Sequence, residues 1–276
     1  MTDPLTVPDR DRSTRESAGL AAQVEAVVAC CRRLHARGLV AGAEGNVSVR
    51  LLDGSILITA TGADKATIES GQVLRCYEDG TLCDNDASLA CASGVPLRDG
   101  PSRPSSEVQM HIGIYAARPD VKAVVHAHPP VATGFAAAHR TIPANVLPEL
   151  PVVVGPVALV PYGRPGTSAL PDAIRAFVAD HEVFLLANHG VTTVGRSLAD
   201  ATMRMESVEQ AARILLSAEL LGGAKPLPNE ESDALSALWR PAGPRASREA
   251  GIVTDATQAP RGATQHIEPQ PTGVLS

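Results

Sequence analysis

The sequence predicts a mixed α/β domain in which helices and strands form layers around one sheet. Three observations favour this class: a long amphipathic helix pattern comes first, an antiparallel hairpin follows, and short apolar runs then alternate with helix-like segments. With 276 residues, 44% of them hydrophobic, the chain can bury a large core. We expect one domain over residues 17–223, with flexible polar or Pro/Gly-rich tails at 1–16 and 224–276.

The first elements are a helix and a hairpin. Apolar side chains repeat at helical spacing at Leu20, Val24, Val27, Val28, Cys31 and Leu34. This stripe predicts a helix over residues 17–37, stopped by Gly38. The next segment reads NVSVRLLDGSILIT, and its Asp53-Gly54 pair suits the tight turn of a hairpin. The sheet therefore begins with an antiparallel pair.

The remaining elements alternate. Ser105 and Ser106 precede SEVQMHIGIYAA, where a serine can cap the start of a helix. We interpret four apolar runs as strands: VKAVVHAH, LPVVVG, VALVPY and EVFLLANHG. Helix-like segments at 130–138 and 171–180 lie between them, and a long helix is predicted at 198–221. One short helix, near residues 235–239, is expected in the C-terminal tail.

Charge and composition exclude several functions. The net charge of −6 offers no basic surface for nucleic acid, so we expect no nucleic-acid partner. No apolar run is long enough to span a bilayer, and the first twenty residues lack the apolar centre of a secretory signal. We expect a cytoplasmic protein that does not bind membranes. The five cysteines are expected to be reduced, since none lies in a C-x-x-C pair.

Three histidines and one glutamate form a candidate metal site. His126 and His128 lie two residues apart in VVHAH, so on a strand both rings project from one face. His189 follows an apolar strand and precedes a glycine, and Glu107 opens a predicted helix. Each has a structural alternative: half-exposed strand histidines, a turn histidine, and a helix cap. Together they suit a divalent ion such as Zn²⁺ and leave one position for substrate.

Several turns could form an anion pocket. Asn46 precedes one strand, Thr61 and Gly62 follow the next, and Ser105 and Ser106 precede a helix whose free amides attract phosphate. The alternative is that these are ordinary turns and caps. No phosphate-binding nucleotide motif is present. His111, four residues after Glu107, lies on the same helical face and is interpreted as a packing residue or as a support for that carboxylate.

Six motifs occur in an order that resembles a known family. They are GAEGNVSVR, ILITATG, PSSE, VVHAHPP, VPYGRPGT and LLANHGVTTVG. Over residues 20–221 the chain resembles the class II aldolase and adducin family, most closely the L-fuculose-phosphate aldolases. The resemblance implies a three-layer α/β/α fold around a mixed, largely antiparallel sheet. It also implies a homotetramer with zinc as cofactor, or alternatively manganese, cobalt or iron.

The resemblance also implies residue roles. His126, His128 and His189 would be metal ligands, and Glu107 a fourth ligand that leaves the metal to act as acid and base. The five pocket residues would hold the substrate phosphate: Asn46, Thr61, Gly62, Ser105 and Ser106. The implied reaction cleaves a ketose 1-phosphate to dihydroxyacetone phosphate and an aldehyde through an enediolate. Small-molecule sugar phosphates are therefore the expected partners.

The resemblance also allows other reactions, and this chain departs from the family at one position. The same fold supports decarboxylases of hydroxy acids or aromatic dihydroxy acids, epimerases, dehydratases and iron-dependent oxygenases, and adducin-like interaction proteins that lack the metal set. Where bacterial fuculose-phosphate aldolases have a tyrosine from a neighbouring subunit that protonates the aldehyde, this chain has Leu147. Archaeal-type aldolases with a similar LPE segment also lack it. Glu149 is a candidate replacement.

Overall fold

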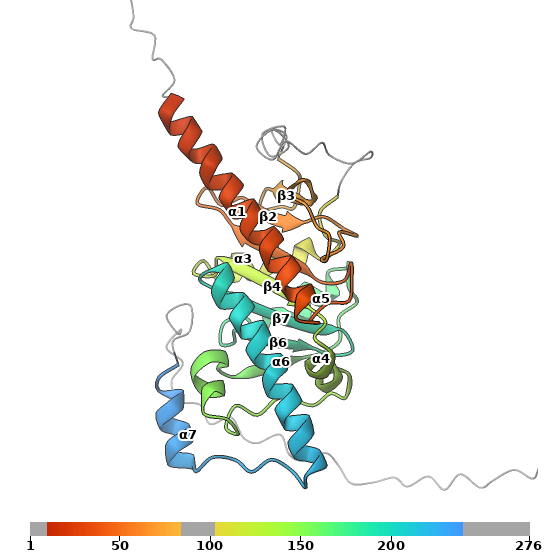
Figure 1. The fold of residues 1–276 in the computed structure, drawn as a ribbon, viewed down its shortest axis with the longest axis vertical. Helices are drawn as coiled ribbons and strands as arrows, with labels where there is room; N and C mark the ends of the chain where they lie inside the picture. The colour runs from red at the N-terminus through yellow and green to blue at the C-terminus, as the bar shows by residue number, and fades with distance from the viewer. Residues whose placement is uncertain (1–9, 84–102, 240–276) are drawn as a thin grey trace, which may run out of the picture. The chain divides into compact units, whose positions relative to one another are not determined.

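The sheet at the centre of the fold has seven strands (Figure 1). The computed structural model describes residues 10–83 and 103–239, which belong to one compact unit. The strand order is β3-β2-β1-β4-β7-β6-β5, and all neighbours are antiparallel except β5 and β6. The strands are β1 (Asn46–Arg50), β2 (Ile56–Thr59), β3 (Val73–Cys76), β4 (Ala123–Ala127), β5 (Val157–Val160), β6 (Val183–Leu186) and β7 (Gly190–Gly195).

Helices cover both faces of this sheet. They are α1 (Arg10–Ala36), α3 (Val108–Ala117), α4 (Pro130–Ala137), α5 (Ala169–Arg175), α6 (Leu198–Leu220) and α7 (Asn229–Ser236). Alternate strand side chains point to opposite faces, and this divides the core into two clusters. Val125 and Leu185 pack in the cluster with α1, α4 and α6, whereas Val124 and Phe184 pack in the cluster with α3 and α5. The predicted three-layer α/β/α fold with a mixed, largely antiparallel sheet is confirmed.

The hairpin and the last long helix also match the sequence analysis. β1 and β2 pair antiparallel across the Asp53-Gly54 turn. Gly54 has a φ of 90°, in the region that favours glycine. α6 begins after Ser197, whose side chain accepts a hydrogen bond from the Asp200 amide at 3.1 Å and so caps the helix.

Three expected boundaries or elements were wrong. α1 begins at Arg10 rather than at residue 17, because the apolar stripe that begins at Leu20 gives no signal for the residues before it. The run LPVVVG is not a strand: Leu150–Val154 form a π-helical turn, and Pro151 supplies no amide for a ladder. β7 was not predicted, because all six of its residues are buried and show no apolar–polar alternation.

The start of the expected C-terminal tail packs against the domain. α7 lies within it, earlier than the predicted helix at 235–239. Trp239 is 7% exposed and lies over Gly155, where a Cβ would come within 2.4 Å of the indole. Residues 224–239 are therefore not a free tail. The rest of that tail and most of the N-terminal one lie outside the described residues, and the boundaries of the domain stay a prediction.

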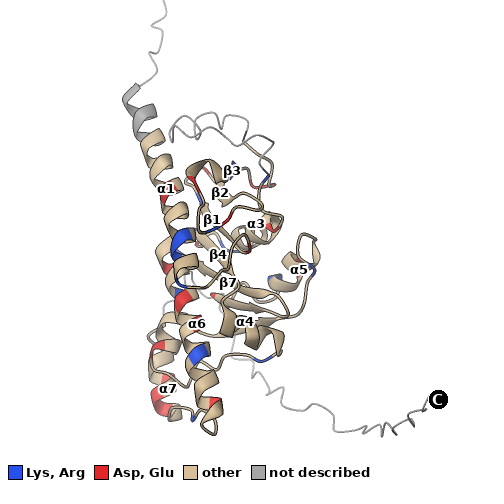
Figure 2. Ribbon diagram, turned by 45° about the vertical axis from the view of Figure 1, so that its right-hand side comes forward, with Lys and Arg blue, Asp and Glu red and all other residues tan. Residues whose placement is uncertain are grey.

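Charged residues of both signs are interspersed along the helices (Figure 2). Arg33 of α1 and Glu206 of α6, for example, form an ion pair at 2.6 Å between the two helices. Among the described residues, Cys30 and Cys31 are buried free thiols, while Cys91 lies outside the described residues. Within the same ranges, no helix has the length and apolar character required to cross a bilayer.

Candidate metal centre

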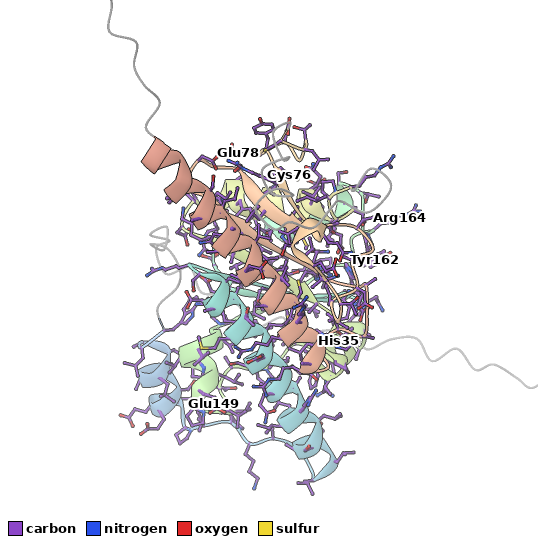
Figure 3. The ribbon with its side chains drawn as sticks, turned by 45° about the horizontal axis from the view of Figure 1, so that its top comes forward. His35, Cys76, Glu78, Glu149, Tyr162 and Arg164 are labelled. Carbon is purple, nitrogen blue, oxygen red and sulfur yellow. The ribbon has the colours of Figure 1, made fainter. Side chains whose placement is uncertain are left out.

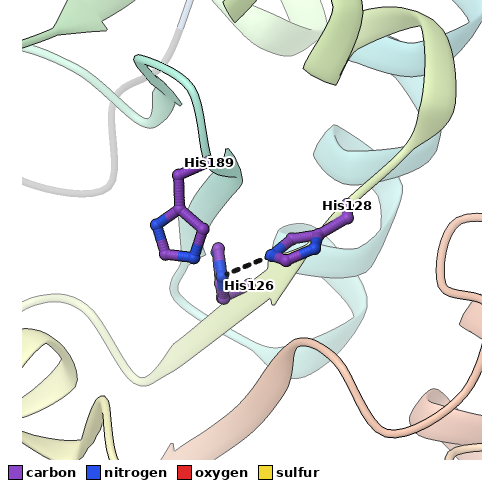
Figure 4. Close-up of side chains that lie close together, drawn as sticks. All are labelled: His126, His128 and His189. Carbon is purple, nitrogen blue, oxygen red and sulfur yellow. Dashed lines mark hydrogen bonds between the residues drawn. The ribbon is translucent and has the colours of Figure 1, made fainter. Parts of the chain in front are cut away.

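Three histidines converge where β4 ends beside β7 (Figure 4). His126 lies in β4, His128 follows it by two residues, and His189 immediately precedes β7. Each offers a ring nitrogen, and the three nitrogens lie within 4.8 Å of one another. The ring centroids are 4.7 to 5.1 Å apart. Because β4 and β7 are neighbouring antiparallel strands, their ends meet at one edge and bring together residues more than sixty positions apart.

Hydrogen bonding determines which nitrogen of His126 is free. Its Nδ1 lies 2.9 Å from the carbonyl oxygen of Val191, which can only accept, so Nδ1 bears the proton. The Nε2 lone pair then points toward Nε2 of His128, 3.3 Å away. Burial lowers the pKa of His126 well below its usual value, and the neighbouring His189 and His128 lower it further. This neutral ring, fixed by a hydrogen bond behind it, is the form in which histidine binds metals.

Glu107 closes the fourth side of the cluster. Its Oε2 lies 3.4 Å from Nε2 of His126 and its Oε1 lies 3.3 Å from Nε2 of His189. Burial lowers the pKa of both histidines, so at neutral pH these contacts are not ion pairs between opposite charges. Within the described part of the chain, Oε1 of Glu107 and Nδ1 of His189 are buried and have no hydrogen-bond partner. A buried carboxylate facing neutral ring nitrogens fits a divalent cation held between them.

The alternative role of Glu107, as a helix cap, is wrong. It occupies the position before α3, but its side chain makes no capping hydrogen bond. Its carboxylate points to the histidines instead, and its own amide donates weakly, at 3.3 Å, to the Ser105 hydroxyl.

Two glycines allow the close packing beneath the rings. A Cβ on Gly190 would lie 2.4 Å from Cδ2 of His128 and 2.7 Å from the Ala127 carbonyl oxygen. A Cβ on Gly45 would lie 2.6 Å from the carbonyl oxygen of His126, and Gly45 also has a φ of 74°. Any larger residue would move the strand ends that hold the histidines.

A buried carboxylate binds the segment that follows His128. Glu209 of α6 accepts hydrogen bonds from the amides of Val131, at 3.1 Å, and Ala132, at 2.8 Å, at the start of α4. These are amides that the helix itself leaves unpaired, and a negative charge at this end is favourable. Arg213 contacts the same carboxylate at 2.8 Å. The helix that follows His128 is thus fixed to α6.

Four of the five predicted phosphate ligands lie on two neighbouring segments. The Thr61 amide donates to the Arg103 carbonyl at 2.9 Å, and the Ser105 amide donates to the Thr59 carbonyl at 3.1 Å. Thr61, Gly62 and Ser106 are exposed, whereas Ser105 is buried beside Glu107. Gly62 has a φ of 70°, and a Cβ there would meet nothing within 4 Å. The two segments therefore present the exposed hydroxyls of Thr61 and Ser106 and the open space at Gly62, and Ser106 is adjacent to Glu107 in the sequence.

Asn46, the fifth predicted phosphate ligand, has a different environment. It is 4% exposed, and its Nδ2 donates to Oε2 of Glu107 at 2.8 Å. Its Oδ1 lies 2.5 Å from Nε2 of His111. His111 was predicted to pack or to support Glu107, and in the structure it contacts Asn46, which in turn contacts Glu107. The spacing of four residues between Glu107 and His111 was the available signal, but the intervening amide was missed.

Glu149, the candidate replacement for the missing tyrosine, and Tyr162 lie in different parts of the domain. Glu149 follows Leu147 by two residues, is exposed, and lines a groove with Arg37, Glu206 and Arg213. None of the candidate metal ligands lines that groove. Figure 3 shows Glu149 beside the π-helical turn and Tyr162 at the other side of the view. Tyr162 is 58% exposed and follows β5, whose last carbonyl accepts from the Ala187 amide, two residues before His189.

Comparisons with known proteins agree on the family. The family model described as "Class II Aldolase and Adducin N-terminal domain" matches residues 25–216. The chain is 34% identical to the 3-oxo-tetronate 4-phosphate decarboxylase of Escherichia coli (strain K12), over 65% of this chain and 79% of that protein. It is 31% identical to the L-fuculose phosphate aldolase of Methanococcus maripaludis (strain DSM 14266), over 67% and 91%.

A solved structure shows the same fold. YgbL from Klebsiella pneumoniae, described as a putative aldolase/epimerase/decarboxylase, superposes with a TM-score of 0.66 and is 30% identical, covering 78% of this chain and 98% of that one. The matching relatives are aldolases and decarboxylases, and the chain keeps a cluster that fits a divalent ion. It is therefore an enzyme of the class II aldolase type, and it belongs to the class II aldolase and adducin family.

Proposed function

We propose that this chain is a metal-dependent carbon–carbon lyase that forms and protonates the enediolate of dihydroxyacetone phosphate. One observation supports this most strongly: the Glu107 carboxylate, with one oxygen that lacks a partner, faces three neutral histidines beside a hydroxyl-lined segment. This arrangement combines a proton acceptor, a cation site and an anion site within a few residues of one another.

The candidate ligands are His126, His128 and His189, with Glu107 as a fourth. They fit because three ring nitrogens lie within 4.8 Å of one another, and because Oε1 of Glu107 and Nδ1 of His189 are buried without a hydrogen-bond partner among the described residues. A bound divalent ion would act as a Lewis acid and stabilise negative charge on the substrate oxygens. Imidazole and carboxylate suit zinc, and also manganese, cobalt and iron; we propose zinc.

The chain's own groups would position the substrate and move the proton. Ser106, Thr61 and the amide of Gly62 would donate hydrogen bonds to a phosphate, and the start of α3 would favour an anion there. Asn46 donates a hydrogen bond to Oε2 of Glu107. Oε1 is therefore the oxygen that would exchange a proton with the substrate carbon. The buried position of Glu107 keeps water from competing for that proton.

Two bond cleavages lead to the same enediolate. Cleaving a ketose 1-phosphate between its third and fourth carbons releases an aldehyde after that aldehyde's hydroxyl has lost its proton. Removing carbon dioxide from a 3-oxo-tetronate 4-phosphate leaves the bonding electron pair on the second carbon. In both cases protonation of the remaining carbon yields dihydroxyacetone phosphate. The names of the matching relatives therefore describe two routes into one half-reaction.

Decarboxylation is the second candidate, and one observation favours it. Leu147 stands where the resemblance places the tyrosine that serves the aldehyde, and it packs against the core. Carbon dioxide departs without a proton, so a decarboxylase requires no such group. A retro-aldol reaction would need another group to take the proton of the hydroxyl that becomes the aldehyde, and the exposed Tyr162, near the strand end that precedes His189, is the candidate in this chain.

Hydrogen exchange tests the shared half-reaction without the leaving group. The metal-loaded protein should incorporate deuterium from D₂O into the hydroxymethyl carbon of dihydroxyacetone phosphate, followed by NMR. Glu107→Gln should keep its metal and lose about 10²- to 10⁴-fold of this rate, because an amide cannot accept the proton. Glu149→Gln is the matched control and should exchange normally. Absence of exchange in the metal-loaded wild type would contradict the proposal.

Product analysis then separates the two routes. The same preparation is given 3-oxo-tetronate 4-phosphate, with detection of carbon dioxide, and L-fuculose 1-phosphate, with detection of the aldehyde. Tyr162→Phe should affect aldehyde formation and leave release of carbon dioxide unchanged. Equal loss of both activities in that variant would exclude Tyr162 as the group that takes the proton from the hydroxyl that becomes the aldehyde.

We propose in addition that the enzyme is a cytoplasmic homotetramer. The family resemblance supports this assembly, and so does the apolar end of α6, where Leu216, Leu220 and Leu221 are exposed. Light scattering during gel filtration of the full chain measures the assembly directly; a monomer at micromolar concentration would contradict it.

A further inference from the structure

A buried lysine joins the segment before β1 to the segment after β2. β1 and β2 are antiparallel neighbours, so the entry segment (residues 41–45) and the exit segment (residues 60–65) emerge from the same end of the sheet. The ammonium of Lys65 donates to the carbonyl of Ala43 in the entry segment, at 3.0 Å. It also donates to the carbonyl of Ala63 in the exit segment, at 2.7 Å. One side chain therefore binds both segments.

Packing alone does not account for a lysine at this position. Lys65 is 1% exposed. Within the described ranges its ammonium forms no ion pair, and its hydrogen-bond acceptors are neutral backbone carbonyls. Burial lowers the pKa of Lys65, and the negative charges of Glu44 and Asp64 raise it by less. A buried charge is costly unless its hydrogen bonds are made, whereas an apolar side chain of the same length would fill this volume without that cost. The ammonium therefore contributes through its donors.

The entry segment is rigid apart from its distance to the exit segment. The Glu44 carboxylate accepts from the Gly42 amide within the segment, at 2.9 Å. At its other end the segment packs against β4, since a Cβ on Gly45 would lie 2.6 Å from the carbonyl oxygen of His126. The Lys65 amide donates to the Gly42 carbonyl at 3.0 Å, beside the contacts of the ammonium. Lys65 thus determines how far apart the two segments lie.

We propose that Lys65 is a positioning residue for the anion pocket, in which its ammonium sets the separation between the segment that leads into Asn46 and the segment that carries Thr61 and Gly62. The proposal rests on the proposed function, which places a substrate phosphate at this end of the sheet. Lys65 is too deeply buried to touch a substrate, so it acts through the two segments. Several donors must reach one phosphate together, and a displacement of about 1 Å between them is enough to weaken its binding.

Lys65→Met is the direct test, because it keeps an unbranched side chain of similar length and removes the charge and the donors. Lys122→Met is the matched control: Lys122 is exposed before β4, and its ammonium donates to a single carbonyl, that of Pro119, at 3.3 Å. In deuterium exchange of dihydroxyacetone phosphate, Lys65→Met should raise the KM about 10- to 100-fold and weaken inhibition by inorganic phosphate to the same extent. The maximal rate and the metal content should not change. Lys122→Met should leave all four quantities as they are.

A Lys65→Met variant with the wild-type KM and the wild-type phosphate inhibition would overturn the proposal. A lower maximal rate at unchanged KM would overturn it as well, because the loss would then concern proton transfer and not the phosphate.

Amide hydrogen exchange of the metal-free full chain measures the segments without substrate. The amides of Gly42, Ala63 and Lys65 are hydrogen-bonded and should exchange slowly in the wild type. Lys65→Met should accelerate their exchange at least about 10-fold, and Lys122→Met should not. Unchanged protection would show that the segments keep their positions without the ammonium. This measurement separates the two proposals: a wild type inactive on dihydroxyacetone phosphate would reject the proposed function, while amide exchange still decides what Lys65 holds.

Lys65→Gln covers the case in which two carbonyls without any donor prevent Lys65→Met from folding. The glutamine amide keeps a donor in the same volume, but it is shorter and uncharged. Its KM and its amide exchange should change in the direction predicted for Lys65→Met, by a smaller factor. Wild-type values of both quantities in Lys65→Gln would contradict a positioning role.

Discussion

Adding a single methyl group at Gly190 should weaken metal binding without replacing any candidate ligand. In Gly190→Ala the new Cβ would lie 2.4 Å from Cδ2 of His128 and 2.7 Å from the Ala127 carbonyl oxygen. Carbon atoms pack best at about 3.5 to 4.0 Å, so the ring would have to retreat by about 1 Å. The carbonyl oxygen cannot retreat as easily, because Ala127 is paired with Val191 in the centre of the sheet.

The expected result has two parts. Displacing one ligand should reduce the affinity for Co²⁺ about 10- to 100-fold, and overpacking should lower the free energy of unfolding by about 1 to 3 kcal/mol. Titration of the metal-free protein with Co²⁺, followed by visible absorption, measures the first, and urea unfolding measures the second. Gly134→Ala is the control: a Cβ there meets nothing within 4 Å, and α4 should gain about 0.5 to 1 kcal/mol. Unchanged Co²⁺ affinity in Gly190→Ala would refute the packing argument.

Three further predictions concern the same regions. The His126→Ala, His128→Ala double variant should lose the one divalent ion per chain expected by elemental analysis of the wild type, and full occupancy would contradict the site. The pKa of His111 is about 3 in the fold and near 6.5 when unfolded, so below pH 6.5 the unfolded state takes up a proton that the native state does not. Stability should therefore fall with decreasing pH, by about 2 kcal/mol at pH 5 from this residue, and His111→Gln should reduce that dependence in urea unfolding of the metal-free protein. A chain ending at Trp239 should be as stable as the full chain, whereas one ending at Gly223 should lose about 3 kcal/mol because the indole no longer covers Gly155; equal thermal midpoints would show that this contact contributes little.

Local patterns predicted the elements that end in a recognisable turn or cap. The hairpin of β1 and β2 has the Asp53-Gly54 turn, and the helix α6 has an apolar stripe and the Ser197 cap. β7 has neither signal, and its sequence GVTTVG reads as a loop after His189. The run at 150–154 misled for the opposite reason: its valines favour a strand, but Leu150 and Val154 are buried in a single helical turn. Side-chain preference could not decide between these packings.

The candidate site divides in a similar way. His126 and His128 could be paired from their spacing alone, whereas Glu107 and His189 joined them by residue type and by their positions at a helix start and a strand end. The environment of Asn46 could not be predicted. It depends on the register of β1 against β4, which places Asn46 opposite His126, and on the position of α3 over the sheet. A turn asparagine beside a glycine gives no sign of either.

The spread of the candidate ligands along the chain links metal binding to folding. His189 follows Glu107 by 82 residues, and the two are brought together only when α3 and β7 have joined the sheet. An unfolded chain cannot present such a set, so a cation that binds it binds the native state alone. At a free concentration of about 100 times its dissociation constant, the ion would add about 2.7 kcal/mol to the free energy of unfolding. Melting curves recorded with zinc, manganese, cobalt and iron would therefore rank the four ions by affinity before any substrate is known.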